Sequence, residues 1–228
     1  MEGTRLRILQ LLQKNTNDTV DGLAQAIGLA TATIRRHLDI LQRDRLVAFE
    51  EVRKKTGRPE YSFFLTEDGQ EALPKDYDML LGLMIGELAE LSVDDTMGRD
   101  GEGVLELVFQ RLSGRVFEDH RQEVEGQSLE VRLKALLRLL GDEDFYPEAN
   151  FVDGTLRIRL INCPFRSVAL RSKAVCTFDS NIISSMLDMA VSQEMCINEG
   201  ADGCVYIGRV DEKTAATSPS NAEVKAAS

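Results

Sequence analysis

The 228-residue sequence is long enough for two small domains, and its 43% hydrophobic and 29% charged residues are ordinary for a globular protein. The apolar pattern near the start is interrupted by charges, and no apolar run approaches a membrane span, so a signal peptide and a membrane protein are not expected. We therefore predict a cytoplasmic protein, without a membrane partner, whose thiols are reduced.

The net charge of −11 is distributed unevenly. Residues 1–73 contain 11 Lys and Arg and 11 Asp and Glu, so the negative charge lies in the rest of the chain. Residues 31–58 contain 8 basic and 4 acidic residues, a local excess of +4. Because attraction to phosphate depends on a local face, this segment can still bind DNA, and we expect dimerisation to supply much of the affinity.

Three helical patterns and a hairpin follow in residues 1–73. The first helix covers residues 4–13, and the second runs from Thr19 to Gly28, a residue that can end it. In the third, TATIRRHLDILQRD, three positions would face the core: Ile34, Leu38 and Leu41. Two strands, LVAFEEV and EYSFFLT, then flank the basic bend RKKTGRP. This order predicts a winged helix-turn-helix domain.

The outer face of the third helix and the tip of the hairpin carry the candidate DNA contacts. Arginine on such faces contacts phosphates or the minor groove. The candidates are Thr31, Thr33, Arg35, Arg36, Arg43, Lys54, Lys55 and Arg58. The string TATIRRHLDILQRDRLV…GRPEYSFFLTEDG resembles the winged-helix domains of ArsR/DeoR-type regulators, which implies a double-stranded DNA operator. Ala30 departs from the serine cap common there, and we predict that Thr31 caps the helix instead.

Residues 74–141 are predicted to form a helical dimerisation or linker region. One helix follows Pro74, residues 92–103 read as a loop, and two more helices follow, the last capped by Ser128 and stopped by Gly141. The broad apolar stripe of the first helix must pack on something. A core within the domain is one explanation, and we favour pairing with the same helix of a second copy, because winged-helix repressors usually read two-fold symmetric sites.

Residues 142–210 are predicted to form a small α/β sensor domain in the order strand, strand, helix, strand, strand. Asp153-Gly154 is a hairpin turn signal, and CTFDSNIISSMLDMAVS is an amphipathic helix. The tail, residues 211–228, has few apolar residues and is predicted to be disordered. The fold class is thus α+β: a winged helix-turn-helix, a helical linker and a small sensor domain.

All four cysteines lie in this last domain, with the spacing C-x12-C-x19-C-x7-C: Cys163, Cys176, Cys196 and Cys204. Each falls at the end of a predicted strand or helix, so the four could converge at one edge of the sheet. Thiolates hold iron–sulfur clusters and tetrahedral zinc. Structural zinc sites usually use closely spaced cysteine pairs, which this spacing lacks, and a cluster spans more space than one ion. A cluster is therefore favoured, with zinc as the alternative.

The segments NCPF, the cysteine twelve residues later and EGADGC resemble the effector domain of SufR-like repressors of iron–sulfur cluster assembly operons. With the winged helix, the resemblance covers roughly residues 3–210. It implies a homodimer holding a [4Fe–4S] cluster that represses cluster-assembly genes and releases DNA when the cluster is lost. Cys163, Cys176 and Cys204 match the motif best, and Cys196 stands at the candidate fourth position.

One other function remains open at the level of sequence, and a third is not expected. The chain could be a winged-helix regulator whose second domain binds a small organic ligand, with structural or zinc-bound cysteines. An enzyme with a reactive cysteine is not expected, because no thiol has a histidine or basic activator nearby in sequence.

Overall fold

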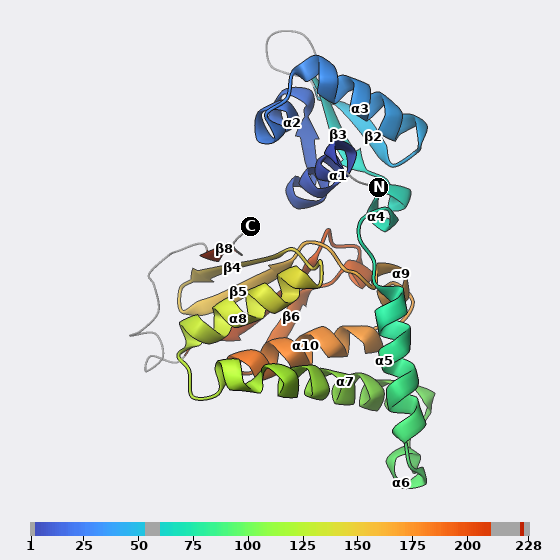
Figure 1. Ribbon diagram of the computed structural model, residues 1–228, viewed down its shortest axis with the longest axis vertical. Helices are drawn as coiled ribbons and strands as arrows, with labels where there is room; N and C mark the ends of the chain where they lie inside the picture. Colours follow the sequence, from blue (N-terminus) through green and yellow to red (C-terminus); the bar gives the residue numbers. More distant parts are fainter. Residues whose placement is uncertain (1–2, 53–59, 211–223, 226–228) are drawn as a thin grey trace. The chain divides into compact units, whose positions relative to one another are not determined.

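The computed structural model describes residues 3–52, 60–210 and 224–225, and it divides the chain into two compact units, Met1–Lys75 and Asp76–Ser228 (Figure 1). Each unit has a core of buried apolar side chains and combines helices with an antiparallel sheet. The predicted α+β class with an N-terminal winged helix-turn-helix is therefore confirmed.

The N-terminal unit has three main helices, a three-stranded sheet and one short helix. Its elements are α1 (Thr4–Asn15), β1 (Asn17–Thr19), α2 (Val20–Ile27), α3 (Thr31–Arg43), β2 (Val47–Val52), β3 (Glu60–Leu65) and α4 (Glu67–Glu71). Strand β3 lies between β1 and β2 and is antiparallel to both. Strands β2 and β3 are the predicted hairpin of the wing.

Local sequence explains the boundaries of α2. The Thr19 hydroxyl caps α2 by accepting from the N–H of Gly22 at 3.1 Å. Gly28 ends α2 with φ 77°, a conformation that glycine adopts without strain.

The start of α3 differs from the prediction. Its N-cap is Ala30, without a side-chain hydrogen bond, so the expected Thr31 cap was wrong: Thr31 is already the first helical residue. Behind it, the three predicted core positions of α3 are buried: Ile34, Leu38 and Leu41.

The C-terminal unit builds one core from helices and a five-stranded sheet. Its helices are α5 (Tyr77–Glu90), α6 (Val93–Thr96), α7 (Gly101–Val124), α8 (Leu129–Asp142), α9 (Arg166–Ala169), α10 (Ala174–Leu187) and the 3-10 helix η1 (Ile197–Glu199). Its strands are β4 (Pro147–Val152), β5 (Thr155–Leu160), β6 (Ser192–Met195), β7 (Cys204–Arg209) and β8 (Val224–Lys225). Helices α7 and α10 lie side by side, α8 packs on both and on β4, and α5 packs on α7 (Figure 1).

Three expectations for this unit were wrong. Residues 92–103 are not a loop throughout: they contain α6 and the start of α7, because Ser92 and Asp100 each cap a helix. Gly141 does not stop α8, which continues to Asp142. Residues 224–225 of the predicted disordered tail pair with β4 as β8, which covers that edge of the sheet, while 211–223 and 226–228 lie outside the described residues.

The sheet topology explains how distant cysteines meet. The strand order is β6-β7-β5-β4-β8, and Leu160 at the end of β5 is paired with Cys204 at the start of β7. Strand β6 runs antiparallel to β7, with Met195 opposite Val205. Cys196, which follows Met195, therefore lies near Cys204 at the start of β7. The turn at Asp153 and Gly154, both with positive φ, sets the register of β4 and β5 as predicted.

Candidate functional site

Helix α3 presents the predicted polar face to solvent. Thr33, Arg35, Arg36 and Arg43 are exposed, and Thr31 is partly exposed. Within residues 3–52 and 60–210 the three arginines form no ion pair, so their guanidinium groups are available to an external anion. The remaining candidates, Lys54, Lys55 and Arg58, lie outside the described residues.

The wing also carries an apolar patch that the sequence analysis missed. The rings of Phe49 on β2 and Tyr61 on β3 meet edge to face, with centroids 4.9 Å apart, and both side chains are about half exposed. The ring of Phe49 also packs near that of the buried Phe63, with the two ring centroids 5.8 Å apart. The alternation of apolar residues along the two strands was the available signal, because residues two apart in a strand share a face.

The C-terminal unit brings the four cysteines together from four separate elements. Cys163 follows β5, Cys176 lies in the first turn of α10, Cys196 precedes η1, and Cys204 begins β7. Cys163 is partly buried and the other three are buried. None is in a disulfide. We call this group of four side chains the thiol site.

The electrostatics of the thiol site reflect burial and mutual proximity. Burial raises the pKa of Cys176 far above that of a free thiol, and the charges of Asp179 and of the other three cysteines add to the rise. Burial likewise raises the pKa of Cys204 to about 12, although the N–H of Ile197 donates to its sulfur and opposes the shift. Cys196 is within hydrogen-bonding reach of Cys204. At neutral pH the thiols of Cys176 and Cys204 are therefore protonated.

Asp179 is a member of this group that the sequence analysis missed. It lies on α10, one turn after Cys176, and its side chain is 5% exposed. Its Oδ1 atom has no hydrogen-bond partner, and burial raises the pKa of this carboxyl to about 7. An acidic residue on the apolar side of a helix, three positions from a cysteine, was the only available signal.

The four thiols of the thiol site are near enough to affect one another's pKa, but they do not form a preformed site for one metal ion. Among the described residues, no group of three or more His, Cys, Asp or Glu side chains is arranged to hold a metal ion. A four-iron cluster distributes its ligands over four iron atoms, so its ligand atoms lie farther apart than those around a single zinc. The described residues thus bring four thiols near one another without a preformed site for a single metal ion.

An ion pair between two exposed side chains joins the residue before α10 to the helix η1 that follows Cys196. Lys173, just before α10, pairs with Glu199 of η1 at 2.5 Å, and both side chains are exposed. The hydrogen bond to Glu199, and then the charge of Glu199, raise the pKa of Lys173, and Cys196 and Cys176 add to the rise. This contact joins two of the segments that carry cysteines.

Helix α5 exposes a continuous apolar face. Leu81, Ile85 and Leu88 follow helical spacing and are 58%, 59% and 46% exposed. Leu80, the residue before Leu81, lies on a different side of the helix and is buried in the core of the unit. The broad stripe predicted from the sequence therefore divides into a buried and an exposed part. Val93 and Met97, in and after α6, are also largely exposed.

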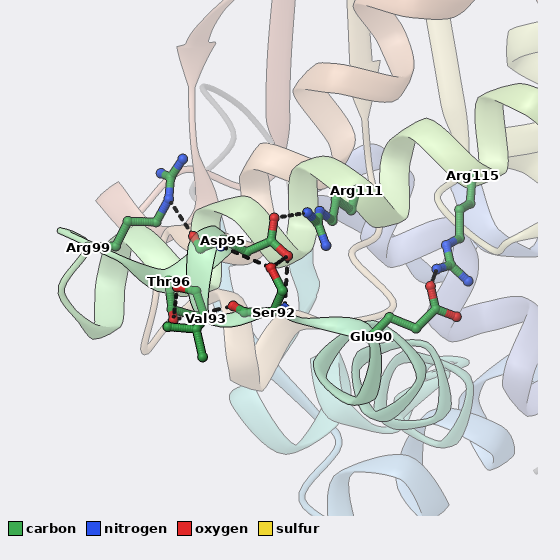
Figure 2. A network of polar contacts seen from close by, with 8 residues as sticks. All are labelled: Glu90, Ser92, Val93, Asp95, Thr96, Arg99, Arg111 and Arg115. Carbon is green, nitrogen blue, oxygen red and sulfur yellow. Dashed lines mark hydrogen bonds and ion pairs between the residues drawn. The ribbon is translucent and has the colours of Figure 1, made fainter.

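A polar network holds α5 and α6 against α7, as Figure 2 shows. Ser92 and Asp95 form a capping box, with hydrogen bonds of 2.9 and 3.2 Å between them, and Asp95 also pairs with Arg111. Arg115 of α7 pairs with Glu90 and with the buried Glu87 of α5. These contacts fix the helix that carries the exposed apolar face.

Within the described ranges, no helix is long and apolar enough to cross a membrane. No curated protein matches the chain. Among solved structures, the chain is similar to Bacillus subtilis PadR in complex with operator DNA (14% identity, TM-score 0.28, covering 81% of this chain and 97% of that one). It is also similar to the phenol-responsive sensory domain of the transcription activator PoxR with phenol (13% identity, TM-score 0.37, covering 81% and 95%).

A family model matches the helix-turn-helix itself. The match covers residues 2–48, which include α1, α2, α3 and the start of β2. The order of the three helices and the buried face of α3 were predicted from the sequence. The N-terminal unit thus carries a helix-turn-helix similar to that of the bacterial regulatory proteins of the arsR family.

Proposed function

We propose that this protein is a cytoplasmic, DNA-binding transcriptional repressor of iron–sulfur cluster assembly genes that senses its own [4Fe–4S] cluster. The observation that carries the proposal is the convergence of four cysteines from separate elements in a chain that begins with a regulator-type helix-turn-helix. The operator is double-stranded DNA, and the thiolates come from Cys163, Cys176 and Cys204, with Cys196 the candidate for the fourth position.

The support for DNA binding lies on α3. Its core face is occupied by leucine and isoleucine, so its arginines point away from the unit that they belong to. Arginines without an internal partner on a recognition helix can contact phosphates and guanine edges. The match of residues 2–48 to a regulator family supports the same conclusion.

The support for a cluster lies in burial and donor type. Thiolates on four segments would be joined through one group, so binding would add cross-links between β5, α10, η1 and β7. When bound, the cluster would link these four segments, and oxidation or iron scarcity would remove the cluster and the link with it. Helix α10 packs on α7 and α7 holds α5, so a shift at the thiol site can reach the exposed face of α5.

We further propose that this α5 face pairs with the same face of a second copy. Leu81, Ile85 and Leu88 form an apolar surface on a helix that also contributes Leu80 to the core. Apolar side chains at this spacing are a typical helix–helix interface, and a two-fold dimer presents two α3 helices to a symmetric operator. The homodimer thus connects the thiol site with DNA affinity.

Anaerobic purification of the full chain provides the test. Iron, acid-labile sulfide and zinc per chain are measured with the visible spectrum, and we expect about four irons and four sulfides per chain, as the formula of the cluster requires. Genomic fragments retained by the loaded protein should include promoters of cluster-assembly genes. Removing the cluster should weaken binding to those fragments at least tenfold.

Each other outcome has a distinct meaning. Equal affinity of loaded and cluster-free protein for the same fragment would contradict the sensor. Zinc without sulfide would make the thiol site a structural clamp. Protein that takes up no metal after reconstitution would leave a winged-helix regulator with an organic effector.

A further inference from the structure

One buried carboxyl group, that of Asp179, lies beside the thiols and has no role in the ligand set proposed above. Asp179 is on α10, inside the C-terminal core, and its side chain is 5% exposed. Positions 176 and 179 lie on the same side of the helix, since residues three apart are neighbours on its surface. The carboxyl group therefore shares the face of α10 that carries the Cys176 thiol.

Nothing among the described residues compensates this carboxylate. Its Oδ1 atom accepts no hydrogen bond, and no basic side chain offsets the effect of burial on its pKa. Buried carboxylates are ordinarily paired, hydrogen-bonded or bound to a metal, because removing the charge from water is costly. Either a proton, which the raised pKa of this carboxyl favours, or a bound cation would relieve the charge of Asp179.

The neighbours of Asp179 are the thiols. Its charge acts on Cys176 and on Cys204 more strongly than the charge of Cys196 does, and it also acts on the buried Tyr206. Cys196, in contrast, already has Cys204 within hydrogen-bonding reach. Of the two candidates for the fourth ligand, Asp179 is the one with a buried oxygen that has no partner.

We propose that the Asp179 carboxylate is the fourth, non-thiol ligand of the cluster, beside the thiolates of Cys163, Cys176 and Cys204. Cys196 then packs beside Cys204 and is dispensable for holding iron. This inference rests on the proposed cluster and names the residue that completes its ligand set. One iron would be held through oxygen, which binds it less strongly than thiolate, and that iron would be the most readily lost.

The experiment compares four full-length proteins reconstituted without oxygen: the unaltered chain, Asp179→Ala, Asp179→Cys and Cys196→Ser. Iron and sulfide content, the electron paramagnetic resonance (EPR) spectrum and the midpoint potential are measured. Cys196→Ser should retain the four-iron cluster and its spectrum. Asp179→Ala should lose at least one iron per cluster and show the spectrum of an oxidised three-iron cluster. Asp179→Cys should restore four irons at a lower potential, because thiolate donates more charge to iron than carboxylate.

A second measurement separates a ligand from a residue that only supports the fold. Asp179→Asn has nearly the same shape and removes the buried charge. It should raise the melting temperature of the cluster-free protein and lower that of the loaded protein, each relative to the unaltered chain. A purely structural residue would shift both in the same direction.

The results also distinguish this inference from the function on which it rests. If the unaltered chain binds no iron and sulfide, both are overturned. If it binds four irons and Asp179→Ala has the same iron content, spectrum and potential, only the assignment of Asp179 is overturned. The same conclusion holds if Cys196→Ser loses the cluster that Asp179→Ala retains.

Discussion

Arg115 on α7 pairs with Glu87 on α5, and the Glu87 side chain is only 1% exposed. The same guanidinium also reaches the exposed Glu90. One half-exposed arginine thus neutralises a buried carboxylate on the helix that carries the exposed apolar face. The position of α5 depends on this contact, because a buried charge without its partner is costly.

Arg115→Ala should therefore destabilise the C-terminal unit. Leaving the buried Glu87 carboxylate unsatisfied costs about 1–3 kcal/mol, which corresponds to a fall of very roughly 2–12 °C in melting temperature for a unit of this size. Calorimetry or circular dichroism checks the change. In the double variant Glu87→Gln with Arg115→Ala much of the stability should return, and a double variant no more stable than Arg115→Ala would show that the pair is not coupled.

Replacing the exposed apolar side chains of α5 should abolish the dimer. Leu81→Glu with Ile85→Glu places two charges on this face, so the protein should be a monomer at concentrations at which the unaltered chain is a dimer. Sedimentation velocity measures the mass. Val131→Glu on α8, whose valine is 41% exposed, is the matched control and should remain dimeric. A dimer that survives the α5 changes would place the interface elsewhere.

Arg36→Ala on α3 should weaken DNA binding and lower its salt dependence. If the guanidinium contacts a phosphate, the slope of log K against log salt should fall by about 1 in magnitude. Fluorescence anisotropy with a mixed-sequence duplex at several salt concentrations gives the slope. Arg7→Ala, at an exposed position on α1, is the control and should leave the slope unchanged. Equal slopes for both variants would contradict a phosphate contact by α3.

Asp95→Asn should lower stability at neutral pH but not in acid. The hydrogen bonds from Ser92, and then Arg111, hold the pKa of Asp95 below its ordinary value of 3.8. A carboxyl with a lower pKa in the folded protein binds its proton less tightly there than in the unfolded chain. Its stabilising contribution is therefore complete above about pH 4–5 and is lost as the pH falls through the folded pKa.

Melting temperatures measured from pH 7 to pH 2.5 test this dependence on the Asp95 carboxyl. The difference between Asp95→Asn and the unaltered chain should narrow at the acid end. Asp94→Asn, which removes a charge from the same turn, should show a smaller difference. A difference for Asp95→Asn that stays constant with pH would mean that the lost stability does not come from the ionised carboxyl.

Some patterns that depend only on neighbouring residues were predicted correctly from the sequence. The spacing of Ile34, Leu38 and Leu41 identified the buried face of α3, and Asp153-Gly154 identified the hairpin of β4 and β5. Helical periodicity and turn conformation are properties of a few consecutive residues, which is why they can be read directly. The Ser92 capping box was equally local, and our loop assignment overlooked it.

Properties that depend on distant segments could not be read in the same way. The stripe on α5 looked continuous, yet Leu80 is buried and Leu81 is exposed, because only the packing of α7 determines which side is covered. Pairing of residues 224–225 with β4 depends on an open sheet edge that composition does not reveal.

The sequence by itself determined the helix-turn-helix, the order of the main strands and helices, and the presence of four thiols near element ends. Only the tertiary structure decided that these thiols converge and that Asp179 lies among them without a partner. The reason is physical: the charge state and burial of a side chain depend on everything that excludes water around it. Around the thiols, the segments that exclude water are far apart in the sequence: Cys163 and Cys204 are separated by 41 positions.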